Sequence, residues 1–118
     1  MMMPSSSARS RPPIDLSPAQ VMQVRHILNS VLTGPESQTR PALAPKVWIF
    51  GTRATGRARP YSDLDVLVSS AHPFDWRIRA NLADAFEGSD LPFRVDVVEE
   101  SRLPPGMVAR VLAERQPL

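Results

Sequence analysis

The feature that most constrains the fold is the polar connection between two apolar segments in the middle of the chain. KVWIF, at residues 46–50, is predicted to be a strand that ends at Gly51, and SDLDVLVSS, at residues 62–70, is predicted to be a second strand. The connection holds glycines, arginines and a proline, and it runs into Asp63 and Asp65. A chain with this connection brings two strands together at one polar turn, which is either an ordinary loop or a reaction centre.

The remaining segments predict helices that alternate with strands. Apolar residues at helical or alternating spacing predict a helix over residues 18–33 that is opened by Ser17 and Pro18, a helix over residues 75–87, a strand over residues 91–100, and a last helix that is opened by Pro104. Within the second helix, Trp76 is expected to pack inward. This order of elements predicts a small α/β fold in which helices pack on a sheet.

Length and composition suit one domain and exclude several classes of function. The chain has 118 residues; we expect residues 1–13, rich in Ser, Arg and Pro, to be a disordered tail and residues 14–118 to be a single domain. Without cysteine there is neither a disulfide nor a thiolate zinc site. A net charge of +2 is too small for bulk nucleic-acid binding. Without a long apolar run or an apolar leader, we expect a cytoplasmic protein with no membrane span.

Asp63 and Asp65 lie two residues apart at the start of the second predicted strand. Side chains alternate across a strand, so the two carboxylates point to one face and repel each other. A divalent cation removes that conflict, and Mg²⁺ prefers such oxygen ligands together with water and substrate phosphates. The alternative is that both are solvated residues at a strand end, because a lone Asp-x-Asp is common by chance.

Asp96 is a third candidate ligand, placed between two valines in the last predicted strand. A carboxylate inside an apolar strand is costly to bury unless it is paired or bound to a metal. If this strand lies beside residues 62–70, Asp96 joins the other two aspartates on one face. The alternative is a strand face open to water, on which Arg94 pairs with Asp96.

Gly51 and Thr52 form the turn that follows the first predicted strand, at a point where a helix can begin. Glycine lets the backbone approach a ligand closely, and the Thr52 hydroxyl can donate to a phosphate oxygen. Arg53, Arg57 and Arg59 add positive charge, although each taken singly is expected to be solvated. Together with three carboxylates, this turn indicates a phosphoryl-transfer site with two Mg²⁺ ions, one at the attacking hydroxyl and one at the leaving pyrophosphate.

Three motifs in this order carry a family resemblance. They are Gly51-Thr52 with Gly56, then Ser62-Asp63-Leu64-Asp65, then Asp96 within VDVV. This pattern resembles the minimal nucleotidyltransferase family of the DNA polymerase β-like superfamily, over residues 46 to 115. The family usually has serine in place of Thr52, which keeps the hydroxyl. The resemblance implies the polymerase β-like nucleotidyltransferase fold, a small mixed sheet with helices packed on it.

The resemblance also implies a role for each matching residue. Asp63 and Asp65 would bind both metal ions, Mg²⁺ or Mn²⁺, and Asp96 would bind the catalytic ion and help to deprotonate the acceptor hydroxyl. The residues that would contact the nucleotide, ATP or another NTP, are Gly51, Thr52, Arg53, Arg59 and Ser62.

From the short length we expect no second domain that covers the nucleotide, and we expect a partner chain or self-association to complete the site. The resemblance implies a helical HEPN-type or substrate-binding partner. The chain would be an antitoxin that transfers AMP to a tyrosine of a HEPN toxin. Two alternatives stay open: a subunit that neutralises its partner by contact without catalysis, and transfer to a small hydroxylated molecule such as an aminoglycoside.

Overall fold

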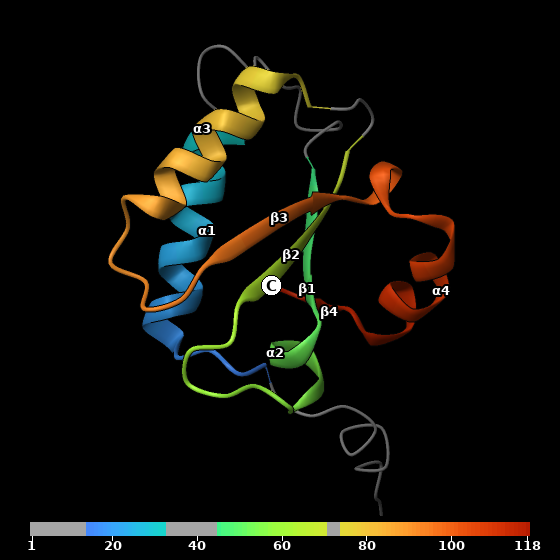
Figure 1. The fold of residues 1–118 in the computed structure, drawn as a ribbon. Helices are drawn as coiled ribbons and strands as arrows, with labels where there is room; N and C mark the ends of the chain where they lie inside the picture. The colour runs from blue at the N-terminus through green and yellow to red at the C-terminus, as the bar shows by residue number, and fades with distance from the viewer. Residues whose placement is uncertain (1–13, 33–44, 71–73) are drawn as a thin grey trace, which may run out of the picture.

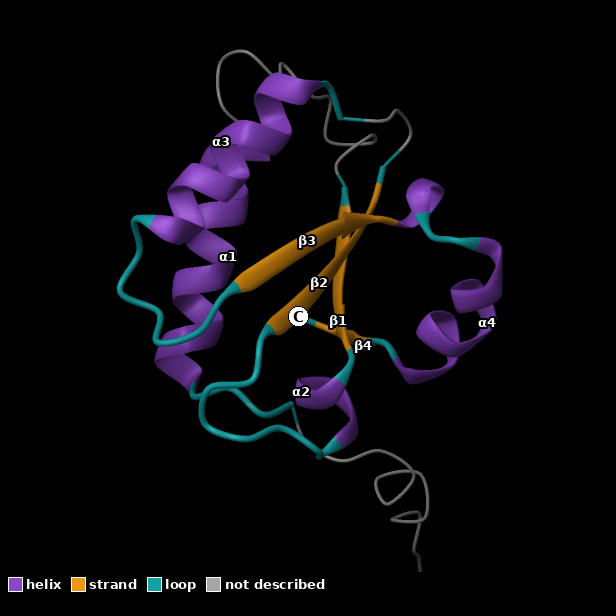
Figure 2. Cartoon of the chain, in the orientation of Figure 1, coloured by secondary structure: helices purple, strands orange, loops and turns teal. Residues whose placement is uncertain are grey.

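The computed structural model of the protein describes residues 14–32, 45–70 and 74–118. Its elements are helix α1 (Pro18–Leu32), strand β1 (Lys46–Phe50), helix α2 (Thr52–Thr55), strand β2 (Leu64–Ser69), helix α3 (Trp76–Glu87), strand β3 (Val95–Glu99), the 3₁₀ helix η4 (Glu100–Arg102), helix α4 (Pro105–Glu114) and strand β4 (Gln116–Pro117) (Figure 2). The predicted helices and strands are confirmed in this order. The predicted disordered tail lies outside the described residues. No helix in the described ranges is long and apolar enough to cross a membrane.

The strands form one mixed sheet in the order β3-β2-β1-β4. β1 pairs antiparallel with β2, and β2 pairs in parallel with β3. β3 begins at Val95 rather than at the predicted residue 91, and Pro92 in that stretch has no N–H for a ladder. The short β4, which was not predicted, pairs with β1. The mixed sheet confirms the fold class that the resemblance implied.

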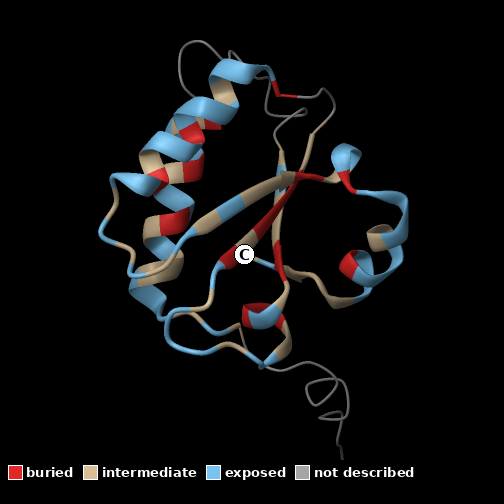
Figure 3. Cartoon of the chain, viewed as in Figure 1, coloured by how far each residue is buried: buried red, intermediate tan, exposed pale blue. Residues whose placement is uncertain are grey.

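Helices cover both faces of the sheet (Figure 1). α1 and α3 pack on one face over the larger core, whose buried members include Val24, Leu28, Ile49, Val66, Leu82 and Phe86. α4 packs on the other face over a smaller core of Phe50, Leu67, Leu103 and Val111. Figure 3 shows the buried positions along the strands and on the inward sides of the helices. The two cores hold the sheet rigidly between its helices, which fixes the end of the sheet where the aspartates lie.

The first turn of α3 differs from the sequence prediction. Leu82 and Phe86 are buried, but Trp76 is 68% exposed. Helical positions six residues apart differ by roughly a third of a turn, so Trp76 does not share the side that carries Leu82. Asp75 begins the helix, because its side chain accepts a hydrogen bond from the Ile78 N–H at 3.0 Å. The prediction that Trp76 packs inward was therefore wrong.

Replacing Val111 by alanine tests how α4 is held on the sheet. Val111 is fully buried, so Val111→Ala is expected to lower the free energy of unfolding by about 2 kcal/mol through lost contacts and a cavity. Its neighbour Leu112 is 36% exposed, and Leu112→Ala is expected to change the same quantity by less than about 0.5 kcal/mol. Urea denaturation measures both. Equal losses in the two variants would contradict this packing of α4.

Candidate functional site

The parallel pairing of β2 and β3 sets two carboxylates side by side. Asp65 and Asp96 are direct partners in the register of these strands. Residues alternate across a strand, so both lie on the sheet face that α4 covers, together with Phe50, the β1 partner of Asp65. Asp63 is exposed and lies one residue before β2. The structure therefore brings Asp65 and Asp96 together, as the sequence predicted for the case in which their strands are neighbours.

Gly51 has a backbone conformation that explains why a glycine stands there. Its φ is 77° and its ψ is −154°, which side chains rarely allow. A Cβ at this position would overlap the Asp65 carboxylate. Thr52 is the first residue of α2, as the sequence predicted, and it is exposed. Absence of a side chain at residue 51 thus lets the β1–α2 turn approach Asp65 closely.

Asp65 lies in an environment with surplus negative charge. Burial is the first cause that raises its pKa, from the usual 3.8 to about 6. The negative charges of Asp96 and Asp63 act in the same direction, and so does Glu114 of α4. Arg110, one helical turn before Glu114, lowers the pKa of Asp65. The carboxylates are therefore electrostatically coupled, and nearby protein cations do not fully balance them.

Glu114 and Arg110 are site residues that the sequence did not reveal. The Gly51 N–H donates to Glu114 Oε1 at 3.0 Å, across a sequence separation of 63 residues. Glu114 thus occupies the backbone donor that the sequence assigned to a phosphate. The spacing of four residues on α4 puts both side chains on one side of the helix. That spacing is common on solvated helices, so it gave no signal that α4 would end beside Gly51.

Arg53 has a structural position that the sequence did not predict. Its side chain is 4% exposed, and its guanidinium donates to the carbonyls of Asp15, Pro60 and Ser62 at 2.9–3.1 Å. The guanidinium also lies 4.1 Å from the ring centroid of Phe93. These contacts tie the 57–63 loop to the start of the described chain, so Arg53 orders the loop from inside.

Arg59 and Ser62 lie together in the loop that leads to Asp63. The backbone N–H of Arg59 donates to the Ser62 hydroxyl at 2.8 Å, and the Arg59 residue is exposed. Ser62 also donates its backbone N–H to the Arg59 carbonyl at 3.0 Å. This reciprocal pair closes a tight turn, which leaves the Arg59 side chain on the surface. Gly56 adopts a left-handed conformation, with φ 76°, and ends α2.

The donor set suits a hard divalent cation. Within the described ranges, no group of three or more His, Cys, Asp or Glu side chains is gathered closely enough to form a finished metal site. Asp96 instead pairs with Arg94 at 3.6 Å, and these side chains are 50% and 78% exposed. The oxygen ligands and the uncompensated charge at Asp65 nevertheless fit Mg²⁺, because a cation between them would relieve their repulsion.

The raised pKa of Asp65 predicts how stability depends on pH in buffer with a metal chelator. Below about pH 3 the group is neutral in both the folded and the unfolded chain, so it has no effect. As pH rises toward 6, the Asp65 carboxyl ionises in the unfolded chain before it ionises in the folded one, which favours the unfolded wild type. Asp65→Asn has no such group, so its stability does not fall for this reason. Asp65→Asn should therefore be the more stable protein at about pH 7.5, and its advantage should shrink as pH falls and vanish below about pH 3.

Thermal unfolding of the two proteins across this pH range measures the effect. Asp90→Asn, at an exposed carboxylate outside the site, is the matched control and should track wild type. A stability difference between Asp65→Asn and wild type that does not change with pH would contradict the proposed charge environment.

Comparison with known proteins agrees with this geometry. A model of the nucleotidyltransferase domain family matches residues 40–118, more than half of the chain. Over 53 residues the chain is 49% identical to the Haemophilus influenzae protein named "Probable protein adenylyltransferase MntA". That alignment covers 45% of this chain and 46% of the relative, so the chain matches about half the length of that protein.

Solved structures share the fold. A minimal nucleotidyltransferase is 34% identical, with a TM-score of 0.54, and the match covers 83% of this chain and 95% of that one. A chain from the crystal structure of a toxin-antitoxin with AMP-PNP is 23% identical, with a TM-score of 0.57 and coverage of 78% and 69%, which shows a common fold. These likenesses confirm the resemblance seen in the three motifs. The match over residues 40–118 shows that the chain belongs to the nucleotidyltransferase domain family.

Proposed function

We propose that this protein is a Mg²⁺-dependent adenylyltransferase that moves AMP from ATP to a hydroxyl of a partner protein. The observation that carries the proposal is the pairing of Asp65 with Asp96 across two parallel strands, beside the Gly51 turn. Carboxylates next to an exposed backbone turn suit a triphosphate with its metal, because the ligands and the phosphate donors meet at one end of the sheet.

The turn after β1 would hold the phosphates. Thr52 is exposed and can donate its hydroxyl, and Arg59 is exposed on the neighbouring loop, where its charge favours a triphosphate. The Gly51 N–H is engaged by Glu114, so a phosphate oxygen that binds there must displace that carboxylate. Ser62 acts with Arg59 by closing the turn that presents it. Arg53 supports this loop from its buried position and needs no contact with the nucleotide.

The reaction is an in-line substitution at phosphorus. The acceptor oxygen bonds to the α-phosphorus of ATP, the bond from that phosphorus to the bridging oxygen breaks, and pyrophosphate leaves with that oxygen. Asp96 is half exposed at the sheet edge and would take the hydroxyl proton. Its partner Arg94, 3.6 Å away on the same strand, would help to orient this carboxylate.

Asp63, Asp65 and Asp96 would hold the metal ions. Bound there, Mg²⁺ would neutralise phosphate charge and favour ionisation of the acceptor hydroxyl. Burial, and after it the charges of Asp96, Asp63 and Glu114, raise the pKa of Asp65, and such an ion would balance these negative charges. Asp65 is therefore the residue whose neutralisation by substitution should most reduce cation binding.

The acceptor is proposed to be a tyrosine of a helical HEPN-type toxin, for which this chain would be the antitoxin. The support is the identity of 49% over 53 residues to a protein named as a protein adenylyltransferase, together with the fold shared with a toxin-antitoxin chain. The half-exposed Asp96 adds physical support, because it lies at an edge of the sheet that a second protein can reach.

Intact-mass spectrometry tests the proposal. The chain is incubated with ATP, Mg²⁺ and the protein encoded by the adjacent gene. That protein should gain the mass of one AMP. Asp63→Asn should lower the rate of transfer by at least about a hundredfold, since lost metal ligation removes several kcal/mol of charge stabilisation.

Asp90→Asn is the matched control and should transfer AMP at the wild-type rate, because Asp90 is an exposed carboxylate away from the site. Transfer by Asp63→Asn at the wild-type rate would contradict the assigned role of the aspartates. Tight binding of the partner without any gain in mass would instead support an antitoxin that acts by contact.

A further inference from the structure

β3 is the last strand of the sheet on its side, so one of its edges is unpaired in the described part of the chain. The Leu64 N–H donates to the carbonyl of Arg94 at 2.8 Å, so the Arg94 backbone faces β2. Backbone direction alternates along a strand in a parallel pair. The N–H and C=O groups of Val95 and Val97 therefore face outward, where they can pair with another strand.

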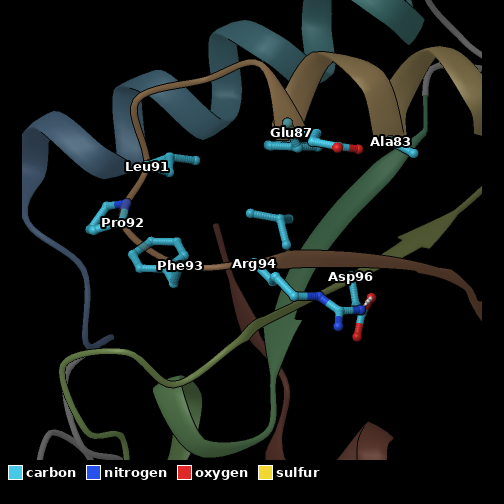
Figure 4. A pocket seen from close by; sticks show the side chains of 9 residues that line it. Ala83, Glu87, Leu91, Pro92, Phe93, Arg94 and Asp96 are labelled. Atoms are coloured by element: carbon cyan, nitrogen blue, oxygen red, sulfur yellow. Dashed lines mark ion pairs between the residues drawn. The ribbon is translucent and has the colours of Figure 1, made fainter.

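Two hollows follow this free edge, between β3 and α3. The larger has a volume of about 720 Å³ and extends from Leu91 and Phe93 to Asp96 (Figure 4). The smaller, of about 180 Å³, continues toward Glu99. Ala83 and Asp96 line both hollows. They therefore form one groove, which we call the edge groove, and its lining includes Asp96, the residue that would accept the hydroxyl proton.

The two sides of β3 offer different chemistry to an occupant of the edge groove. In Figure 4 the side chains of Arg94 and Asp96 point away from α3, toward the sheet face that carries the aspartates. On the α3 side the lining is mixed: apolar residues such as Leu91 and Phe93 lie beside the charged Glu87 and Arg79. An added strand would place alternate side chains on these two sides. A polar acceptor side chain would face the aspartates, and its apolar neighbours would contact the apolar residues on the α3 side.

The charged side chains at the rim of the edge groove indicate what charge a bound segment would carry. Arg79 of α3 lines the smaller hollow, and its side chain is 42% exposed. It lies 3.7 Å from Glu99, whose side chain is only 5% exposed. Arg79 is therefore the exposed cation in the lining of the smaller hollow, which also holds the half-exposed Asp96, and it could pair with an acidic residue of the bound segment.

We propose that the edge groove binds an extended segment of the acceptor protein, which pairs as a strand with Val95 and Val97 and delivers its tyrosine hydroxyl to Asp96. Apolar residues next to the tyrosine fill the hollow under α3, and an acidic residue further along meets Arg79. This inference rests on the proposed protein adenylylation and adds how the acceptor is recognised. Main-chain pairing supplies affinity, and the alternating pockets supply specificity.

Filling the edge groove tests the inference. Ala83 is exposed on α3 and lines both hollows, so Ala83→Trp should block the segment. Ala80 is exposed on the same helix and lines neither, so Ala80→Trp is the matched control. The KM for the adjacent-gene protein in AMP transfer should rise about tenfold or more in Ala83→Trp, equivalent to about 1.4 kcal/mol. Calorimetric binding of AMP-PNP should stay unchanged in both variants.

Val97→Pro provides a second, independent test. It removes an outward N–H while the ladder to β2 stays intact, and proline is tolerated at a free edge. Its KM for the partner should also rise, measured well below the temperature at which the variant unfolds, with an AMP-PNP affinity close to wild type. If both Ala83→Trp and Val97→Pro keep the wild-type KM, the edge groove is not the docking site.

Calorimetry with the partner protein separates this inference from the proposed reaction. Partner binding that weakens about tenfold in Ala83→Trp but not in Ala80→Trp supports docking in the edge groove, whether or not wild type transfers AMP. Equal partner binding by both variants overturns the inference even if transfer occurs. Absence of transfer by wild type, with partner binding still weakened in Ala83→Trp, would overturn the proposed reaction alone.

Discussion

The parallel ladder between β2 and β3 is the constraint on which the candidate site depends. Its register makes Asp65 and Asp96 neighbours, and strand alternation directs both to one face. A shift of one residue in either strand would send its aspartate to the opposite face, into the core under α1 and α3. The apolar residues next to the two aspartates hold the register, because they fill or border that core on alternate positions: Leu64, Val66, Val95 and Val97. Apolar packing therefore decides where the polar chemistry lies.

This geometry places carboxylates close together, so they repel one another. Asp65 is partly buried beside other carboxylates, and its raised pKa shows that the folded protein disfavours its charge. Gly51 permits the close approach of the neighbouring turn, and Glu114 adds one more negative group from α4. A chain that keeps such an unfavourable arrangement is typical of a functional site, where a cationic ligand relieves the strain. Packing in the two cores stabilises the fold enough to offset the repulsion between the carboxylates at this end of the sheet.

Sequence alone predicted much of this arrangement because each part has a local signal. The Gly51 turn, the Asp63-Asp65 pair and the order of helices and strands follow from short-range pattern and backbone preference. The tertiary contacts had no such signal: Glu114 reaches Gly51 across 63 residues, and Arg53 is buried by carbonyls from three separate positions. From sequence alone, an arginine in a polar loop is a reasonable candidate for a phosphate ligand, and only the fold shows which groups surround its side chain.

The edge groove belongs to the same class of features that only the fold reveals. Nothing in the sequence of β3 shows that it would be the last strand of the sheet, or that α3 would stand back from it to leave a hollow. The proposed acceptor segment would complete the sheet at this edge. Docking and chemistry would then share one strand, since Asp96 belongs to both.

The most direct test of the central claim is to measure Mn²⁺ binding by electron paramagnetic resonance in the presence of AMP-PNP. Wild type should bind Mn²⁺, and Asp65→Asn should weaken that binding about tenfold or more, because it removes a charged oxygen ligand from a site with surplus negative charge. The exposed-site variant Asp90→Asn should bind as wild type does. Equal affinity of Asp65→Asn and wild type would contradict the account, because the aspartates at the end of β2 and β3 would then not be the cation site.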